Sequence, residues 1–135
     1  MMNRLEFSII INADHTSIWK ALWEDHSYRE WASIFFKGSY MLVPKWEAGS
    51  HVHFLTPDQS GIFSRIEKYI PNKLIQFKHL GSVKDGIEQA MDEETKKWTG
   101  ATESYQLISS KDHIRLQVDI DAVSYTHLRA HETDS

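Results

Sequence analysis

The order in which hydrophobic periodicities follow one another constrains the fold of this chain more than any other feature. Apolar and polar residues alternate over residues 5–11, as in a strand with one apolar face. Apolar residues then recur at helical spacing over roughly 15–25, behind Asp14 as an N-cap, and Ser27 is suited to cap a second short helix. Every later segment with a clear period has period two. This order predicts an α+β domain with an antiparallel sheet and its helices on one side.

The later strands are separated by turn signals. They are predicted over residues 40–43, 51–56, 62–70, 74–80, 103–109 and 114–121. Pro57 to Gly61 and the pair Pro71 and Asn72 mark tight turns. The polar stretch 81–98 is predicted to be a loop that holds at most a short helix, at about 87–97. With the first strand included, the sequence predicts a sheet of six to seven strands.

Composition restricts the classes of function. The chain has 135 residues, which fits one domain, and it contains no cysteine, which excludes disulfides, thiolate nucleophiles and cysteine-based zinc sites. The net charge is −4 and no basic run occurs, which argues against nucleic acid as a partner. The chain shows no secretion signal and no apolar stretch long enough to span a membrane, so a cytoplasmic location is expected.

The last thirteen residues, 123–135, do not continue the pattern of the domain. They read Val-Ser-Tyr-Thr-His-Leu-Arg-Ala-His-Glu-Thr-Asp-Ser and show neither an apolar stripe nor a clear period. This segment resembles translated adapter or vector sequence, and a polar natural terminus is the alternative. We therefore expect a domain over 1–122 and a non-native tail over 123–135.

Three short motifs near the N-terminus carry a resemblance to a known family. They are Ile-Ile-Ile-Asn-Ala at 9–13, Ile-Trp-Lys-Ala-Leu-Trp at 18–23 and Tyr-Arg-Glu-Trp at 28–31. The turn Trp-Glu-Ala-Gly-Ser at 46–50 and the segments 64–77 and 98–107 follow in the same order as in that family. Together they resemble the SRPBCC (START-like, helix-grip) superfamily, most closely the branch named for the activator of the heat-shock-protein-90 ATPase.

The resemblance implies a curved antiparallel sheet in β-α-α-β order that grips a long C-terminal helix, with a cavity between sheet and helix. In the family that helix follows the last strand, and here residues 123–135 stand in its place. The closing helix is therefore expected to be missing, which leaves a C-terminally truncated domain whose concave sheet face is uncovered.

Aromatic residues are the main candidates for a ligand site. The chain has 5 Trp, 5 Tyr and 6 Phe, and aromatic rings build rigid, dry pocket walls as well as ordinary cores. If the implied cavity exists, Arg65 and Glu103 are candidate polar anchors inside it. The candidate lining residues are Trp23, Trp31, Trp46, Phe54, Phe77, Trp98 and Tyr105.

Candidate chemistry beyond this is sparse. His51 and His53 share one face of a strand and become a zinc site only if a third ligand joins them, for which His79 and Glu103 are the candidates. Two histidines on a polar face are the favoured interpretation. No G-x-S-x-G motif and no phosphate-binding glycine loop occur, so we predict no catalytic residue, metal or cofactor.

Three functions follow from these features. The favoured one is a non-catalytic START-like domain that binds a small apolar, aromatic or lipid-like ligand. The second is a co-chaperone-like module that binds a protein partner, a heat-shock ATPase, as the branch name suggests. The third is a cyclase- or hydrolase-type enzyme of the same superfamily, which requires an inward-facing polar network that the sequence does not reveal.

Overall fold

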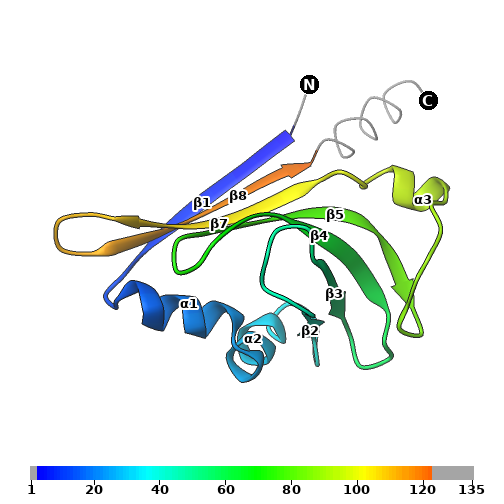
Figure 1. The fold of residues 1–135 in the computed structure, drawn as a ribbon, viewed down its shortest axis with the longest axis horizontal. Helices are drawn as coiled ribbons and strands as arrows, with labels where there is room; N and C mark the ends of the chain where they lie inside the picture. Colours follow the sequence, from blue (N-terminus) through cyan, green and yellow to red (C-terminus); the bar gives the residue numbers. More distant parts are fainter. Residues whose placement is uncertain (1–2, 123–135) are drawn as a thin grey trace.

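The computed structural model describes residues 3–122 (Figure 1). The segment 123–135, on which the expectations of a non-native tail and a missing closing helix rest, lies outside the described residues. The elements are β1 (Asn3–Ile11), α1 (His15–Trp23), α2 (Asp25–Ala32), β2 (Tyr40–Leu42), β3 (His51–Leu55), β4 (Gly61–Ile70), β5 (Leu74–Lys84), β6 (Ile87–Glu88), α3 (Glu93–Lys96), β7 (Thr102–Ser109) and β8 (Ile114–Ala122).

The strands form one antiparallel sheet in the order β1-β8-β7-β5-β4-β3-β2, and the short β6 pairs with β5. The sheet curves, and α1 and α2 lie beneath its concave side (Figure 1). This confirms the predicted α+β architecture and its β-α-α-β opening. No helix within residues 3–122 is long and apolar enough to cross a membrane.

The stretch 81–98 differs from its prediction. Strand β5 continues to Lys84, and Asp85 and Gly86, both with positive φ, turn the chain back into β6. Only one helical turn, α3, forms after this hairpin, and the Asp92 carboxylate caps it by accepting the Thr95 N–H at 2.8 Å. The short helix that the sequence suggested is therefore confined to Glu93–Lys96, because a tight turn took the residues before it into the sheet.

Local signals set the two helices under the sheet. The Asp14 carboxylate accepts the Ser17 N–H at 2.7 Å, which confirms it as the cap of α1. Glu24 leaves the helical conformation at φ −66° and ψ 142°, and α2 starts directly behind it. Ser27 lies inside α2 and is not its cap. The two helices are thus separated by a single extended residue.

The core lies between these helices and the concave face. It is formed by Ile18, Trp19 and Trp23 of α1 with the inward side chains of the central strands, and Phe77 and Ile75 of β5 are fully buried. Burial of such side chains contributes about 1.5–3 kcal/mol each before entropy. The central strands therefore anchor the fold.

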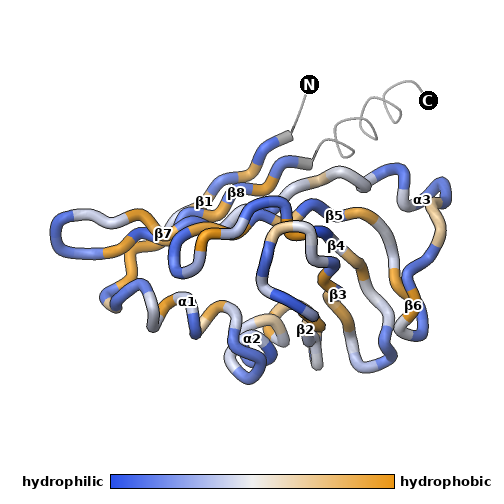
Figure 2. Tube along the Cα trace, in the orientation of Figure 1, coloured by the Kyte–Doolittle hydropathy of each residue, from blue (hydrophilic) through white to orange (hydrophobic). Residues whose placement is uncertain are grey.

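The inward apolar stripe of β1 is poorly covered within the described residues. Leu5, Phe7 and Ile9 are 63%, 58% and 57% exposed, although they pair in register with Ile120, Val118 and Leu116 of β8. Figure 2 shows this alternation of hydrophobic and hydrophilic residues along β1. Within the described residues these side chains stay exposed, because β1 is an edge strand beyond the cover of α1 and α2.

The difference in burial predicts opposite responses to substitution on the same sheet. Phe77→Ala is expected to lower the free energy of unfolding by about 3–5 kcal/mol, since it leaves a cavity in the core. Phe7→Thr is expected to change it by less than about 0.5 kcal/mol, because the ring is largely exposed and threonine suits a strand. Urea denaturation of the full chain measures both, and an equal loss for the two variants would contradict the prediction.

Candidate functional site

The larger of two described cavities, here called the main cavity, lies between α2, the segment 33–39 and the central strands. Its volume is about 500 Å³. Most of its walls are aromatic or aliphatic side chains. The lining residues are Trp23, Tyr28, Trp31, Ala32, Phe35, Phe36, Ser39, Phe54, Leu55, Thr56, Ser60, Gly61, Ile62, Phe77, His79, Glu103 and Tyr105.

The aromatic walls lock one another in place. Trp23 and Tyr105 meet edge to face with centroids 4.9 Å apart, and Phe54 and Phe77 do so at 5.2 Å. The Trp31 indole N–H donates to the Leu22 carbonyl oxygen at 3.0 Å, which fixes that ring against α1. A wall built this way is dry and preorganised, as ligand pockets require.

One polar network interrupts the apolar lining. The Tyr105 hydroxyl donates to Glu103 Oε1 at 3.0 Å, and Glu103 Oε2 lies 3.6 Å from His79 Nε2. His79 Nδ1 lies 2.6 Å from the Oγ of Ser64, which is fully buried. A proton on Nε2 is favoured beside the carboxylate, so the Ser64 hydroxyl donates to Nδ1. The cavity therefore has a single charged pole, centred on Glu103.

Strand register brings this network together. Ser64 and His79 are cross-strand partners, and a register shift between Phe63 and Ser64 sets their pairing. The backbone of His79 is also held from its other side, because its N–H donates to the Ala101 carbonyl at 2.8 Å. The imidazole is thus fixed both at its ring and at its main chain.

Burial and charge act together on the tyrosines of the cavity. Burial, and secondarily the charge of Glu103, raises the pKa of Tyr28 to about 12. Burial is also the main reason that the pKa of Tyr105 lies well above its usual range, and the charge and hydrogen bond of Glu103 add to it. Both hydroxyls are therefore neutral hydrogen-bonding groups throughout the physiological range.

The aromatic residues singled out from the sequence separate into three groups. Trp23, Trp31, Phe54, Phe77 and Tyr105 line the main cavity. Trp46 lines a second, smaller cavity, and Trp98 lines neither of the two. Whether these rings contact a ligand remains a prediction.

The polar candidates also separate. Glu103 reaches the main cavity, whereas Arg65 points away from it and pairs with Glu67 at 3.0 Å. The sequence did not predict that Ser64 and His79 form a pair, because their contact depends on the register shift between β4 and β5. Nothing in the spacing of the two residues along the chain signals it.

The two histidines of β3 do find a common partner, and it is neither of the predicted ones. Glu88 Oε2 lies 3.2 Å from His51 Nδ1 and 2.8 Å from His53 Nε2, and both imidazoles lie beside the Phe63 ring. Over residues 3–122, no group of three or more His, Cys, Asp or Glu side chains is arranged to hold a metal ion. The cluster is a hydrogen-bonded surface feature.

The raised tyrosine pKa values predict how stability responds to alkali. Unfolded tyrosine has a pKa near 10.0, so the unfolded chain loses the Tyr28 proton before the folded one does. The stability that the neutral Tyr28 side chain contributes is therefore fully present below pH 10.0, and it is lost as the pH rises toward about 12. Glu103→Gln is expected to lower the folded pKa of Tyr28, which tyrosine-labelled NMR titration measures. An unchanged Tyr28 titration in that variant would contradict the role of the Glu103 charge.

Comparison with known proteins yields similarity at the level of structure alone. No protein-family model matches the chain, and no curated protein does. The Aha1 dimer from Colwellia psychrerythraea, solved in solution, is 21% identical over 87% of this chain and 74% of its own, with a TM-score of 0.59. Protein MLL2253 from Mesorhizobium loti reaches 0.64 at 15% identity, over 96% and 84% of the two chains.

The crystal structure of Ara h 8.0201 extends the similarity to a more distant sequence. It superposes with a TM-score of 0.62 at 8% identity, over 90% of this chain and 78% of its own. At these identities the likeness establishes the fold and carries no ligand or partner across. The chain therefore shares with these structures an α+β fold built on a curved antiparallel sheet, which is the fold that the resemblance of its motifs implied.

Proposed function

We propose that this chain is a binding module that holds a small apolar or aromatic, lipid-like ligand in the main cavity. The observation that carries the proposal is a preorganised aromatic cavity of about 500 Å³ with one polar pole. This volume falls within the range of about 300–1,000 Å³ typical of small-molecule sites. The fold, which hosts ligand-binding proteins, supports the same function.

The polar pole indicates which end group the ligand presents. The Glu103 carboxylate accepts hydrogen bonds, and one of its oxygens, Oε1, already accepts a hydrogen bond from the Tyr105 hydroxyl. A ligand hydroxyl that reaches Oε2 adds a donor, whereas a ligand carboxylate brings a second negative charge into a largely apolar space. We infer that the ligand is a neutral hydroxylated aromatic or lipid molecule, and that fatty-acid-like anions are disfavoured.

A second function, proton transfer on the bound ligand, is favoured by the Ser64–His79–Glu103 network. Ser64 is fully buried and does not line the cavity, so it is not placed as a nucleophile. His79 does line it, with Nε2 beside a carboxylate, which is the arrangement of a general acid or base. The sequence alone did not reveal this network. The cyclase- or hydrolase-type function depends on it.

The binding proposal predicts a preference between two probes of the same size. We expect 2-naphthol to raise the Tm of the full chain by several degrees at saturating concentration and 2-naphthoate to raise it less. Glu103→Gln is expected to narrow this preference about tenfold, the equivalent of ~1.4 kcal/mol. Glu6→Gln, which removes the same charge from the exposed edge strand, is the matched control. A preference for naphthoate in the unaltered chain would contradict the proposed polarity.

The catalytic alternative has its own test. Candidate hydroxylated ligands are incubated with the full chain and followed by mass spectrometry. Conversion that disappears in His79→Gln, while the thermal shift persists, would support proton transfer through His79. Ligands that bind and remain unchanged in the unaltered chain would favour the binding module alone.

A further inference from the structure

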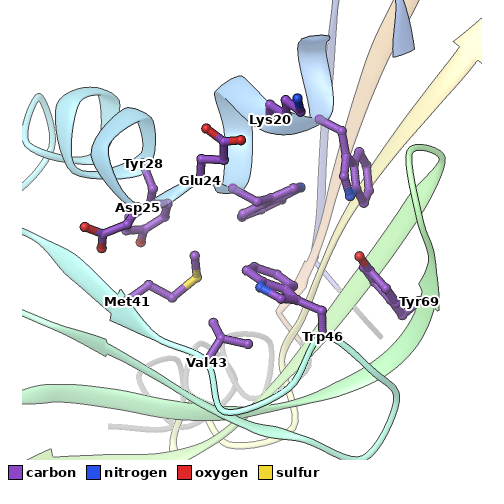
Figure 3. Close-up of a pocket in the computed structure, with 10 residues that line it drawn as sticks. Lys20, Glu24, Asp25, Tyr28, Met41, Val43, Trp46 and Tyr69 are labelled. Carbon is purple, nitrogen blue, oxygen red and sulfur yellow. The ribbon is translucent and has the colours of Figure 1, made fainter. Parts of the chain in front are cut away.

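The second cavity lies on the far side of Trp23 from the main cavity. It opens between α1, the junction of α1 and α2, the β2–β3 loop and the β4–β5 hairpin, and its volume is about 350 Å³ (Figure 3). Its lining residues are Trp19, Lys20, Trp23, Glu24, Asp25, Tyr28, Met41, Val43, Trp46 and Tyr69. Trp23 and Tyr28 border both cavities, and the remaining lining residues are not shared.

Four of these side chains form a closed circuit of aromatic rings. Centroid distances are 6.2 Å for Trp19–Trp23, 6.1 Å for Trp23–Trp46, 6.2 Å for Trp46–Tyr69 and 6.4 Å for Tyr69–Trp19. The planes of successive rings are inclined by 32° to 71°, so the rings do not stack as one block. All four line the same cavity, and Figure 3 shows Trp46 and Tyr69 facing it from the sheet side. We call this circuit the aromatic ring site.

The dimensions of the circuit match those of a site for an organic cation. Adjacent ring centroids lie 6.1–6.4 Å apart, and in a square arrangement of such sides the centre lies about 4.4 Å from each centroid, within the ~6 Å at which a cation is attracted to a ring face. The rings are rigid and already in contact, so little conformational entropy is lost on binding. Indole is the strongest of the aromatic partners for a cation, and three of the four rings are indoles.

The surroundings of the circuit favour a methylated ammonium over a primary one. The buried Trp23 Nε1 has no hydrogen-bond partner within the described residues. An indole N–H only donates, so it cannot accept a hydrogen bond from an ammonium N–H of a ligand. A primary ammonium would lose its hydrogen bonds to water among these rings, whereas a methylated ammonium has none to lose.

Charged side chains stand at the rim. The Glu24 side chain is exposed and makes no hydrogen bond or ion pair among residues 3–122, while the Asp25 carboxylate is paired with Arg29 at 2.9 Å. Lys20, one helical turn before Glu24, carries the opposite charge. The Glu24 carboxylate is therefore the rim group available to a cation, and Lys20 is expected to oppose one.

The outer wall is both accessible and held in place. Trp46 and Tyr69 are half-buried, whereas Trp19 and Trp23 are buried behind them. The loop that carries Trp46 is fixed to β4, because the Gly49 N–H donates to the Ile66 carbonyl at 2.7 Å and the Ile66 N–H donates to the Ser50 carbonyl at 2.9 Å. A ligand thus reaches a preformed site past Trp46 and Tyr69.

We propose that the aromatic ring site is a second binding site, separate from the main cavity, for a methylated ammonium group. The test titrates the full chain with choline and with 3,3-dimethyl-1-butanol, its uncharged isostere, and follows tryptophan fluorescence and NMR shifts. Choline is expected to bind about tenfold more tightly than the isostere, because only the charged group gains cation–π attraction. Equal affinity for the two probes, or no binding of choline at millimolar concentrations, would overturn the proposal.

Variants locate the site. Trp46→Ala is expected to weaken choline binding about tenfold, and Trp98→Ala, which removes an indole that lines neither cavity, is expected to leave it unchanged. Trp46→Phe is expected to fall between them, which keeps the test decisive if the alanine variant does not fold. Glu24→Gln is expected to weaken binding and Lys20→Gln to strengthen it.

A last variant separates this proposal from the function proposed for the main cavity. Glu103→Gln is expected to leave choline affinity unchanged, since Glu103 does not line the smaller cavity. Loss of choline binding in Glu103→Gln, with binding intact in Trp46→Ala, would place the cation in the main cavity and overturn the aromatic ring site.

Discussion

The packing of Trp23 is the interaction on which the arrangement of this molecule depends. At the end of α1, its indole contacts rings from α1 and α2, from the β2–β3 loop, and from β5 and β7. It therefore sets the distance between the helices and the concave face of the sheet. The same ring borders both cavities, a position it shares with Tyr28, so the shape of each cavity depends on this rigid side chain.

Periodicity was sufficient to predict the architecture, because each strand and helix of the core buries one face. The predictions were less accurate where tertiary context decides the outcome. Ile87 and Glu88 entered the sheet because Asp85 and Gly86 turn tightly. The local pattern of the sequence does not reveal this effect.

The aromatic lining of the candidate site was predictable from the sequence, and its polar network was not. Aromatic content and the family resemblance pointed to rings that the structure does place around the main cavity. The polar pole escaped prediction, because Ser64 and His79 meet through a shift in strand register, and the partner of His51 and His53 comes from a two-residue strand that the sequence reading did not foresee. Long-range register is the part of a sheet that a single sequence specifies least visibly.

The pairing of β1 with β8 has a consequence for how the domain forms and opens. The two strands are joined by almost the whole chain, with Asn3 opposite Ala122, so their alignment requires closure of the longest loop in the described residues. The strand that completes this pair gains little burial in return, since its apolar side chains remain largely exposed. The N-terminal strand is therefore expected to join the sheet late in folding, and its amide protons to exchange with solvent sooner than those of β4 and β5.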